Sequence, residues 1–594
     1  MIRWLREHAH WVLVAIAAIV LVVHSLQYNF VTDDAYISFV FSRNFAEHGE
    51  LTFNLGQPVE GYTNFSWTLL LGLLMVVGVP PEFASRVLGT ACAIGTLIVV
   101  TRIMLHALGR RSPWAGVPAL LLASSSGFAC WSSGGLETQL FTLLVIAALE
   151  AVVAATTTPR AIRRAGWLLA LAAMTRPEGP MIAAVLGAIR LVQLVLDWRA
   201  TKRFPLRDEL YAAAWFLGLW VPWFAWRYFY YGHLFPNTYY VKAAGDWLRP
   251  EMATEMVRHG AYYIWIWLVQ TQLVHVLLVV AVGIAAVRPR TPRFVTAVAC
   301  ALIALFYVPY TISVGGDFMG LHRFIMPLFV IAAILVVLGA ERIGSLIPDE
   351  RVSFPAAMGS GLALAVLAVF TVRYGYVAAR AGAVPELVLA SFVFVLYLGV
   401  RLGAGDRRLA YALAAGTLLV GAFALTQVAL TRRSLDPKNL LADRGVIDTP
   451  AFLIVYTEDR ATIGKAMAPC FRDDDFSIVG GAGAQPYYAR MRGIDVFGLV
   501  SERIAHEEKR TRPRAGHTKW GSDALLASYD PTFVFSCYAI HRTAAQPQLP
   551  CAGFWKNLGY EEVTMHIPDL RERGEYYTFL AKKARNFQCP GRVH

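Results

Sequence analysis

Two adjacent carboxylates, Asp33 and Asp34, follow the first long apolar run of the chain. Neighbouring like charges and partial burial both raise the pKa of a carboxyl group, and a carboxylate tuned in this way can serve as a general base toward an attacking hydroxyl. The pair could also hold a divalent cation, or could simply end a helix at a water-facing turn. We take Asp33 as the base, because it comes first at the helix end, and Asp34 as its partner or as a substrate ligand.

Long apolar runs must position these carboxylates. The chain is 56% hydrophobic and 16% charged, whereas soluble proteins carry about 25% charged residues. A spanning helix needs about 20 apolar residues, so we predict a polytopic α-helical membrane protein with a membrane domain over residues 1–433. About thirteen spans are expected, at residues 11–26, 86–105, 114–128, 138–153, 166–174, 181–195, 211–230, 262–287, 294–311, 324–338, 354–372, 387–400 and 409–429.

The distribution of Lys and Arg predicts how these spans are oriented. Basic residues gather in short loops, which stay in the cytoplasm. These loops lie at 110–111, 160–164, 199–207, 288–293, 341–351 and 401–408. The net charge of +13 therefore reflects membrane topology rather than nucleic-acid binding. An odd number of crossings must separate the loop after the first span from 110–111, so the short apolar run at 65–79 is expected not to cross fully.

The same topology places one set of polar loops outside, together with the C-terminal region. These loops are 32–64, 130–137, 175–178, 233–245 and 314–323. They carry the unusual polar residues, whereas the inner loops are merely basic, and this one-sided arrangement favours an active site at the outer face. A transporter would show charges deep in the spans and matching halves, and we find no convincing repeat.

Near residue 434 the long apolar runs stop and charged residues become common. We predict a soluble α/β domain over residues 434–594, outside the membrane, with buried strands at 452–456, 476–479 and 532–536. An oxidising compartment would allow four cysteines of this domain to form disulfides in any of three pairings. They are Cys470, Cys537, Cys551 and Cys589. The other cysteines, Cys92, Cys130 and Cys300, lie in or near apolar spans and are expected to pack there.

Several polar segments together resemble one class of membrane enzymes. The run 32–71, TDDAYISFVFSRNFAEHGELTFNLGQPVEGYTNFSWTLLL, resembles the first outer loop of GT-C glycosyltransferases. The resemblance is to the bacterial arabinofuranosyltransferase subgroup in particular, which includes mycobacterial terminal β-(1→2) arabinofuranosyltransferases. Further similar segments are SGGLETQLF (133–141), TRPEG (175–179), FPNTYYVK (235–242), GGDFMGLHRF (315–324) and GAGAQPYYARMRGIDVFGLVSERIAH (481–506).

This resemblance implies an inverting glycosyltransferase of the bacterial plasma membrane, with the catalytic Asp in the first outer loop. The donor would be a polyprenyl-phosphate-linked sugar, D-arabinofuranose in the first instance, and the acceptor a hydroxyl of an extracytoplasmic glycan or protein. The energy would come from the donor bond, so no nucleotide motif is expected, and the sequence contains no P-loop. No cofactor is firmly predicted, although a divalent cation at the carboxylates is compatible with the sequence.

Cationic groups on the outer side should meet the departing phosphate, because electrostatic catalysis stabilises charge that builds in the transition state. The candidates are Lys242, Arg176, His322 and Arg323. Each also has a purely structural interpretation. Arg176 could pair with Glu178, Lys242 could be an interfacial anchor, and the His322-Arg323 pair could form an ion pair with Asp317.

Sugar hydroxyls require directed hydrogen-bond partners, and a sugar ring suits an aromatic face. The candidates are Glu60, Tyr62, Asn64, Trp131, Glu137, Asn237, Asp317, His506 and His517. Trp131 could instead belong to the interfacial aromatic belt, and the two histidines could be ordinary surface residues. Three alternatives stay open: a donor with a hexose, another pentose or aminoarabinose; a lipid or glycan transporter; and a non-catalytic scaffold with a binding domain.

Overall fold

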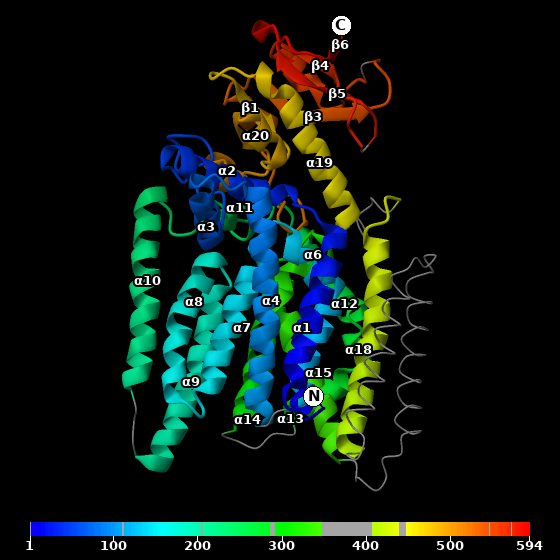
Figure 1. Cartoon of the computed structure of the whole chain (residues 1–594). Coiled ribbons are helices and arrows are strands. Elements are labelled where there is room, and N and C mark those ends of the chain that lie inside the picture. The colour runs from blue at the N-terminus through cyan, green and yellow to red at the C-terminus, as the bar shows by residue number, and fades with distance from the viewer. Residues whose placement is uncertain are drawn as a thin grey trace.

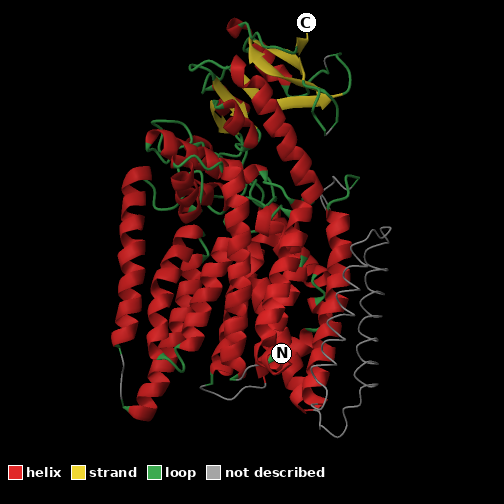
Figure 2. Cartoon of the chain, in the orientation of Figure 1, coloured by secondary structure: helices red, strands yellow, loops and turns green. Residues whose placement is uncertain are grey.

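The computed structural model shows a long helical bundle with a small sheet-containing domain at one end (Figure 1). The structure describes residues 2–109, 112–202, 206–285, 291–346, 407–438, 447–545, 547–571 and 573–593. The N-terminus lies at the end of the bundle opposite the sheet, and the C-terminus lies at the top of the sheet domain (Figure 1). All the strands gather at that end, while the rest of the described chain is helix and loop (Figure 2).

The bundle consists of apolar helices of very different length. The long helices are α1 (Ile2–Tyr28), α4 (Pro81–Leu108), α9 (Gly179–Thr201), α10 (Arg207–Tyr231), α12 (Pro250–Gln270), α14 (Pro292–Ser313), α15 (Met326–Leu346) and α18 (Arg407–Ser434). The shorter elements are η1 (Pro113–Gly116), α5 (Val117–Ser124), α6 (Ser126–Ser133), α7 (Thr138–Ala154), η2 (Pro159–Ile162), α8 (Arg163–Thr175), η3 (Leu273–His275) and α13 (Leu277–Ala285).

Among the described residues, five helices are long and apolar enough to cross a membrane, or six if one bent pair is a single span. The five are Glu7–Tyr28, Pro81–Leu108, Gly179–Thr201, Pro292–Ser313 and Gly320–Ile343. The predicted polytopic helical architecture is therefore confirmed, whereas the count of about thirteen spans stays a prediction. Two of the predicted spans, 354–372 and 387–400, lie outside the described residues.

Two apolar runs that the sequence predicts as single spans are interrupted. The run 114–128 bends by 66° between α5 and α6, and the run 262–287 breaks at Gln272, whose φ is +59°. At both breaks the side chain of Gln427 in α18 bonds to a backbone group. Its Oε1 accepts from the N–H of Ser126 at 3.1 Å, and its Nε2 donates to the C=O of Gln270 at 2.8 Å. Inside a membrane such groups need an internal partner.

The first loop forms two helices at the end of the bundle that carries the sheet (Figure 1). The helix α2 (Asp33–His48) has most of its residues buried and packs on α3 (Phe65–Val76) and on the C-terminal domain. The 12 residues of α3 give a helix of about 18 Å, which is shorter than the roughly 30 Å of a bilayer core. The helix by itself is therefore too short to span a bilayer core, and the incomplete crossing of this segment stays a prediction.

The C-terminal domain is a mixed sheet covered by short helices, in agreement with the predicted α/β class. Its strands are β1 (Phe476–Val479), β2 (Arg492–Asp495), β3 (Phe533–His541), β4 (Tyr560–His566), β5 (Tyr576–Lys582) and β6 (Arg592–Val593), in the order β2-β1-β3-β5-β4-β6. The β1 strand pairs with β2 and β3 in parallel, and the remaining pairs are antiparallel. The covering elements are α19 (Pro450–Met467), η6 (Ala468–Cys470), α20 (Ala484–Ala489), α21 (Glu502–Glu507), α22 (Asp523–Ala527), α23 (Ala552–Asn557) and η7 (Lys583–Arg585).

The predicted strands at 476–479 and 532–536 are present as β1 and within β3, but the predicted strand at 452–456 is wrong. That segment belongs to α19, which begins at Pro450. The side chain of Thr449 accepts from the N–H of Phe452 and caps the helix, and a cap followed by proline is a strong helix start. The consecutive apolar residues there belong to the first turns of a helix rather than to a buried strand.

Two disulfides brace the domain, and they choose one of the three pairings that the sequence left open. Cys470 pairs with Cys589, and Cys537 pairs with Cys551. The other three cysteines form no disulfide among the described residues. Cys130 and Cys300 are buried and Cys92 is half-buried, which agrees with the packing role predicted for them.

Candidate active site

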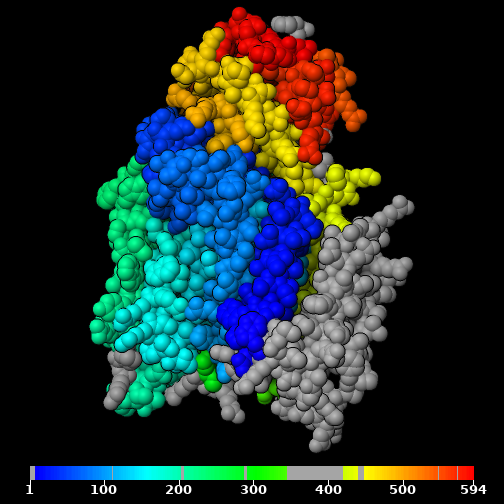
Figure 3. All heavy atoms as spheres, in the orientation of Figure 1, coloured from blue at the N-terminus to red at the C-terminus, as the bar shows by residue number. Residues whose placement is uncertain are grey.

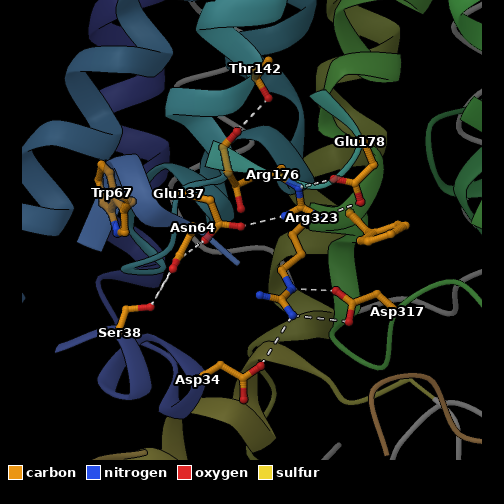
Figure 4. A network of polar contacts seen from close by, with 12 residues as sticks. Asp34, Ser38, Asn64, Trp67, Glu137, Thr142, Arg176, Glu178, Asp317 and Arg323 are labelled. Carbon is orange, nitrogen blue, oxygen red and sulfur yellow. Dashed lines mark hydrogen bonds and ion pairs between the residues drawn. The ribbon is translucent and has the colours of Figure 1, made fainter. Parts of the chain in front are cut away.

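The charged residues of the outer loops meet where the bundle joins the C-terminal domain, and Asp34 lies at their centre. Asp34 stands in the first turn of α2, with 30% of its side chain exposed. One guanidinium nitrogen of Arg323 lies 3.6 Å from its Oδ2. Figure 4 shows Arg323 between Asp34 and Asp317. The Nε of Arg323 donates to Asp317 at 2.6 Å. Burial raises the pKa of Asp34, against the opposing charges of Arg323 and Lys242.

Asp33, the neighbouring carboxylate, turns away from this cluster and into the C-terminal domain. Its side chain is 9% exposed, and its Oδ1 accepts from the N–H of Ala484 at 2.8 Å. The backbone of Gly481 and Gly483 packs directly against it. Burial raises the pKa of Asp33 to about 6, although the hydrogen bond from Ala484 lowers it. The two carboxylates thus have different partners, and among the described residues neither belongs to a group of three metal-ligating side chains.

Lys242, at the end of α11 (Asn237–Lys242), supplies the least engaged cation of the region. Its side chain is exposed, and its charge acts on Asp34 and Asp317. No described residue accepts a hydrogen bond from it or forms an ion pair with it. An ammonium group that no carboxylate neutralises is available to an anionic ligand, which distinguishes Lys242 from the neighbouring arginines.

Arg176 is buried between two carboxylates. It donates to Glu137 at 2.7 Å and to both oxygens of Glu178 at 3.1 and 3.2 Å, and the ring of Phe324 covers it at 5.0 Å. Asn64 donates to the other oxygen of Glu137 at 2.9 Å and exchanges hydrogen bonds with Ser38 of α2 (Figure 4). Arg176, Glu137 and Asn64 therefore link the first loop to α8 through a closed polar network.

The turn that delivers Arg323 has an unusual backbone. In η4 (Gly320–Ile325), Leu321 and His322 have φ values of +59° and +63°. His322 is buried and its Nε2 lies 2.8 Å from Oε1 of Gln270, so it faces α12 rather than Asp34. Trp131 is fully buried, donates from Nε1 to the C=O of Gly320 at 3.1 Å, and carries Arg323 over its ring at 5.7 Å. Trp131 and the strained turn thus position Arg323.

Glu60 and Tyr62, further along the first loop, are held by α10. Glu60 is buried and pairs with Arg227 at 2.9 Å, and the hydroxyl of Tyr62 lies 3.0 Å from that of Tyr231. Burial raises the pKa of Glu60 to about 7, although Arg227 opposes the shift. These contacts fix the loop against the bundle and leave both side chains occupied.

The remaining predicted residues lie at the seam with the C-terminal domain. Asn237 donates to the C=O of Gly498 at 2.7 Å and of Leu499 at 2.9 Å. His517 is enclosed edge-on by the rings of Phe318 and Phe497, at 4.5 and 4.3 Å. Burial, followed by the charge of Arg514, lowers the pKa of His517 to about 3.

His506 differs from His517 in being exposed. Its ring stacks on His233, with centroids 4.7 Å apart, and contacts the tilted ring of Tyr240 at 4.3 Å. The structure therefore brings His517 toward the charged cluster but places His506 at the outer edge of the seam.

Known proteins resemble this chain in fold but not detectably in sequence. No family model matches the sequence, and no curated protein matches it. The structure nevertheless superposes on ArnT from Cupriavidus metallidurans bound to undecaprenyl phosphate, with a TM-score of 0.55 and 15% identity over 96% of this chain and 97% of that chain. This chain has the GT-C fold. ArnT in the apo state gives a TM-score of 0.50 with 14% identity, over 97% of this chain and 98% of that chain.

The GT-C fold that the outer-loop motifs imply is thus confirmed. The arabinosyltransferase EmbB from Mycobacterium smegmatis is also similar, with a TM-score of 0.40 and 14% identity over 71% of this chain and 41% of that chain. At 15% identity the likeness to ArnT shows the fold alone.

Three charged residues of the candidate site, Asp448, Arg514 and Arg227, were missed from the sequence. Asp448 is buried, pairs with Arg514 at 2.8 Å, and its backbone bonds to those of Phe318 and Gly320. Burial raises the pKa of Asp448 to about 6, although Arg514 opposes the shift. Neither residue stands in a motif. Arg227, in contrast, follows a long run of uncharged, mostly apolar residues in α10, and a charge in such a place is a signal of function or pairing.

Proposed function

We propose that the chain is an inverting glycosyltransferase that moves a sugar from a polyprenyl phosphate to a hydroxyl of an extracytoplasmic glycan or protein. D-arabinofuranose is the first candidate sugar. The GT-C fold and the segments that resemble the arabinofuranosyltransferase subgroup support the proposal. The two disulfides of the C-terminal domain favour an oxidising compartment for that domain, and therefore an active site on the extracytoplasmic face of a bacterial plasma membrane.

The position of Asp34 carries the proposal. It is the partly exposed member of the acidic pair, whereas Asp33 is sealed against Ala484. Two cations, Arg323 and Lys242, act on it from the other side. A carboxylate that water can reach, beside an ammonium group with no carboxylate partner among the described residues, matches what a transfer from a sugar phosphate needs: one base and one anion site.

In the proposed reaction Asp34 takes the proton of the acceptor hydroxyl as the oxygen attacks the anomeric carbon. The new bond joins the acceptor oxygen to that carbon, the bond from the carbon to the phosphate oxygen breaks, and the electron pair leaves with the polyprenyl phosphate. A single displacement inverts the configuration. Lys242 would stabilise the charge on the leaving phosphate, and Arg323 would assist while Asp317 holds it in place.

The other predicted residues receive supporting roles in this proposal. Asp33 would fix the start of α2 against the C-terminal domain, rather than act as the base. Arg176, Glu137 and Asn64 would hold the loop that carries Asp34, because their polar groups are already engaged with each other. Donor phosphate would therefore meet Lys242 rather than Arg176 or His322.

The test is transfer by the purified protein from decaprenyl-phosphoryl arabinofuranose to a short arabinoside. Asp34→Asn should abolish transfer while donor still binds, and Asp33→Asn should retain part of the activity if the protein folds. Asp474→Asn, an exposed carboxylate of the C-terminal domain, is the matched control and should match wild type. Loss of activity in Asp33→Asn with full activity in Asp34→Asn would reverse the assignment.

The donor should be varied in the same assay, because the geometry does not select the sugar. Lipid-linked hexose, another pentose and aminoarabinose are the donors to compare. Transfer from one of these alone would keep the glycosyltransferase proposal and replace arabinofuranose. Full glycan formation by a variant that lacks both carboxylates would instead favour a transporter or scaffold.

A further inference from the structure

A second polar cluster lies apart from Asp34, at the outer edge of the seam between bundle and C-terminal domain. It consists of His233, in the loop between α10 and α11, and of Glu502 and His506, one turn apart on α21. Nε2 of His233 lies 2.5 Å from Oε1 of Glu502. One ligand atom from each of the three side chains lies within 4.8 Å of the other two. The proposed transfer reaction uses none of these residues.

We propose that His233, Glu502 and His506 bind one divalent transition-metal ion, with zinc as the preferred ion. Two imidazole nitrogens and one carboxylate oxygen are a common ligand set for zinc. Zinc ligands stand about 2.0–2.1 Å from the ion, and thus about 3.3 Å from each other in a tetrahedral site. The His233 and Glu502 atoms, 2.5 Å apart, would separate slightly to admit the ion, and the ligand atom of His506 lies within 4.8 Å of both.

The backbone around the cluster is fixed before any ion binds. Asn237 donates to the C=O groups of Gly498 and Leu499 and so holds the turn that leads into α21. Ser501 caps α21 by accepting from the N–H of Ile504. On the bundle side, Gly232 ends α10 in the left-handed conformation, and His233 follows directly. A metal would therefore meet ligands whose main chains are in place.

A small cavity beside the cluster provides a second observation. It is lined by both His233 and Glu502, and also by Glu60 and Asn237. Asn237 is 5% exposed, and its Oδ1 accepts no hydrogen bond from a described residue. A water bound to the ion is a strong donor and would satisfy this buried oxygen while it fills the fourth coordination position. An acceptor without a donor is otherwise costly in a buried place.

The charges nearby allow a cation to bind. Glu502 is the anionic ligand, and a neutral imidazole ring is the form in which each histidine would bind the ion. An opposing charge acts on His506 from Lys519, whose ammonium group donates to the C=O of Ala505 at 2.6 Å. Because His233 and α21 belong to different parts of the fold, the ion would join the C-terminal domain to the bundle.

The experiment measures zinc itself on the purified full chain, with no affinity tag, after treatment with EDTA and desalting. Titration with zinc against a fluorescent chelator should give one ion per chain for the wild type. His506→Ala and Glu502→Gln should bind at least tenfold more weakly. The control is His566→Ala, which removes a histidine from an exposed His–Glu pair, 3.3 Å from Glu575. That pair has no third metal ligand among the described residues, so this variant should bind zinc as the wild type does.

Thermal unfolding separates lost binding from lost folding. Zinc should raise the unfolding midpoint of the wild type and of His566→Ala, but not that of His506→Ala or Glu502→Gln. Without zinc, all four proteins should unfold at similar temperatures. The proposal is overturned if the wild type binds no zinc, or if His506→Ala and Glu502→Gln bind it as tightly as the wild type. These readouts do not depend on sugar transfer, so they stand apart from the proposed function.

Discussion

The carboxylate of Asp33 accepts a hydrogen bond from the backbone N–H of Ala484, which lies 451 residues further along the chain. This contact joins the first turn of α2 to the glycine-rich turn before α20, and it seals Asp33 while the adjacent Asp34 stays partly exposed. The space-filling view shows the C-terminal domain seated directly on the first-loop segment (Figure 3). The C-terminal domain therefore buries Asp33 and leaves Asp34 partly exposed.

Gly483 is the residue that makes this approach possible. A Cβ at this position would lie 2.2 Å from the backbone oxygen of Asp33 and 2.4 Å from its carboxylate. Gly483→Ala should therefore push the turn away from α2, with a loss of about 1–3 kcal/mol in the free energy of unfolding and a fall in transfer activity. Thermal unfolding and the transfer assay measure both effects. Gly553→Ala, where a Cβ meets nothing within 4 Å, is the control and should be neutral.

Asp34 should control the acid limb of the pH profile. A general base works only when deprotonated, so kcat/KM should fall as the pH drops through the pKa of Asp34, which burial raises above its usual value. Asp34→Asn should lower the rate by roughly 10²–10⁴-fold and remove this limb. Asp33→Asn should keep the limb. A limb that persists unchanged in Asp34→Asn would show that another group is the base.

Arg176 should matter for stability more than for donor binding. Removing it leaves Glu137 and Glu178 buried without their partner, and breaking a buried pair in this way costs about 3–5 kcal/mol. Arg176→Ala should unfold at a much lower temperature than wild type. Arg503→Ala, which removes an exposed pair with Glu507, should change stability by about 1 kcal/mol or less. If Arg176→Ala is as stable as wild type but binds the donor more weakly, Arg176 contributes to the phosphate-binding site.

The two disulfides should contribute unequally to stability. Cys470–Cys589 spans a sequence separation of 119 residues, whereas Cys537–Cys551 spans 14. If closure of the unfolded chain dominates, their removal costs about 5 and about 3 kcal/mol respectively. Replacing each pair by serines and comparing thermal unfolding of the full chain tests the difference. A larger loss from the shorter loop would mean that local packing at Cys537 decides instead.

The sequence by itself determined the helical membrane architecture and most of the element boundaries. Apolar runs of spanning length, basic loops between them and a polar C-terminal quarter follow from composition along the chain. The sequence failed where one residue changes the backbone locally. Thr449 caps the start of a helix in a segment for which the sequence predicts a strand. Gln427 bonds to the backbone at the breaks in two apolar runs that hydropathy predicts as continuous.

The candidate site likewise has features that the sequence predicts and others that only the tertiary structure decides. Sequence patterns placed Asp33, Asp34, Lys242, Arg323 and most of their neighbours in outer loops, because charges are costly inside a membrane and collect at its boundary. Only the tertiary structure decided which carboxylate is sealed and which stays open, since that depends on Ala484, far away in the chain. The pairing of Asp448 with Arg514 and the grouping of His233 with α21 could not be predicted from the sequence either, because contacts between distant segments produce no periodic pattern in it.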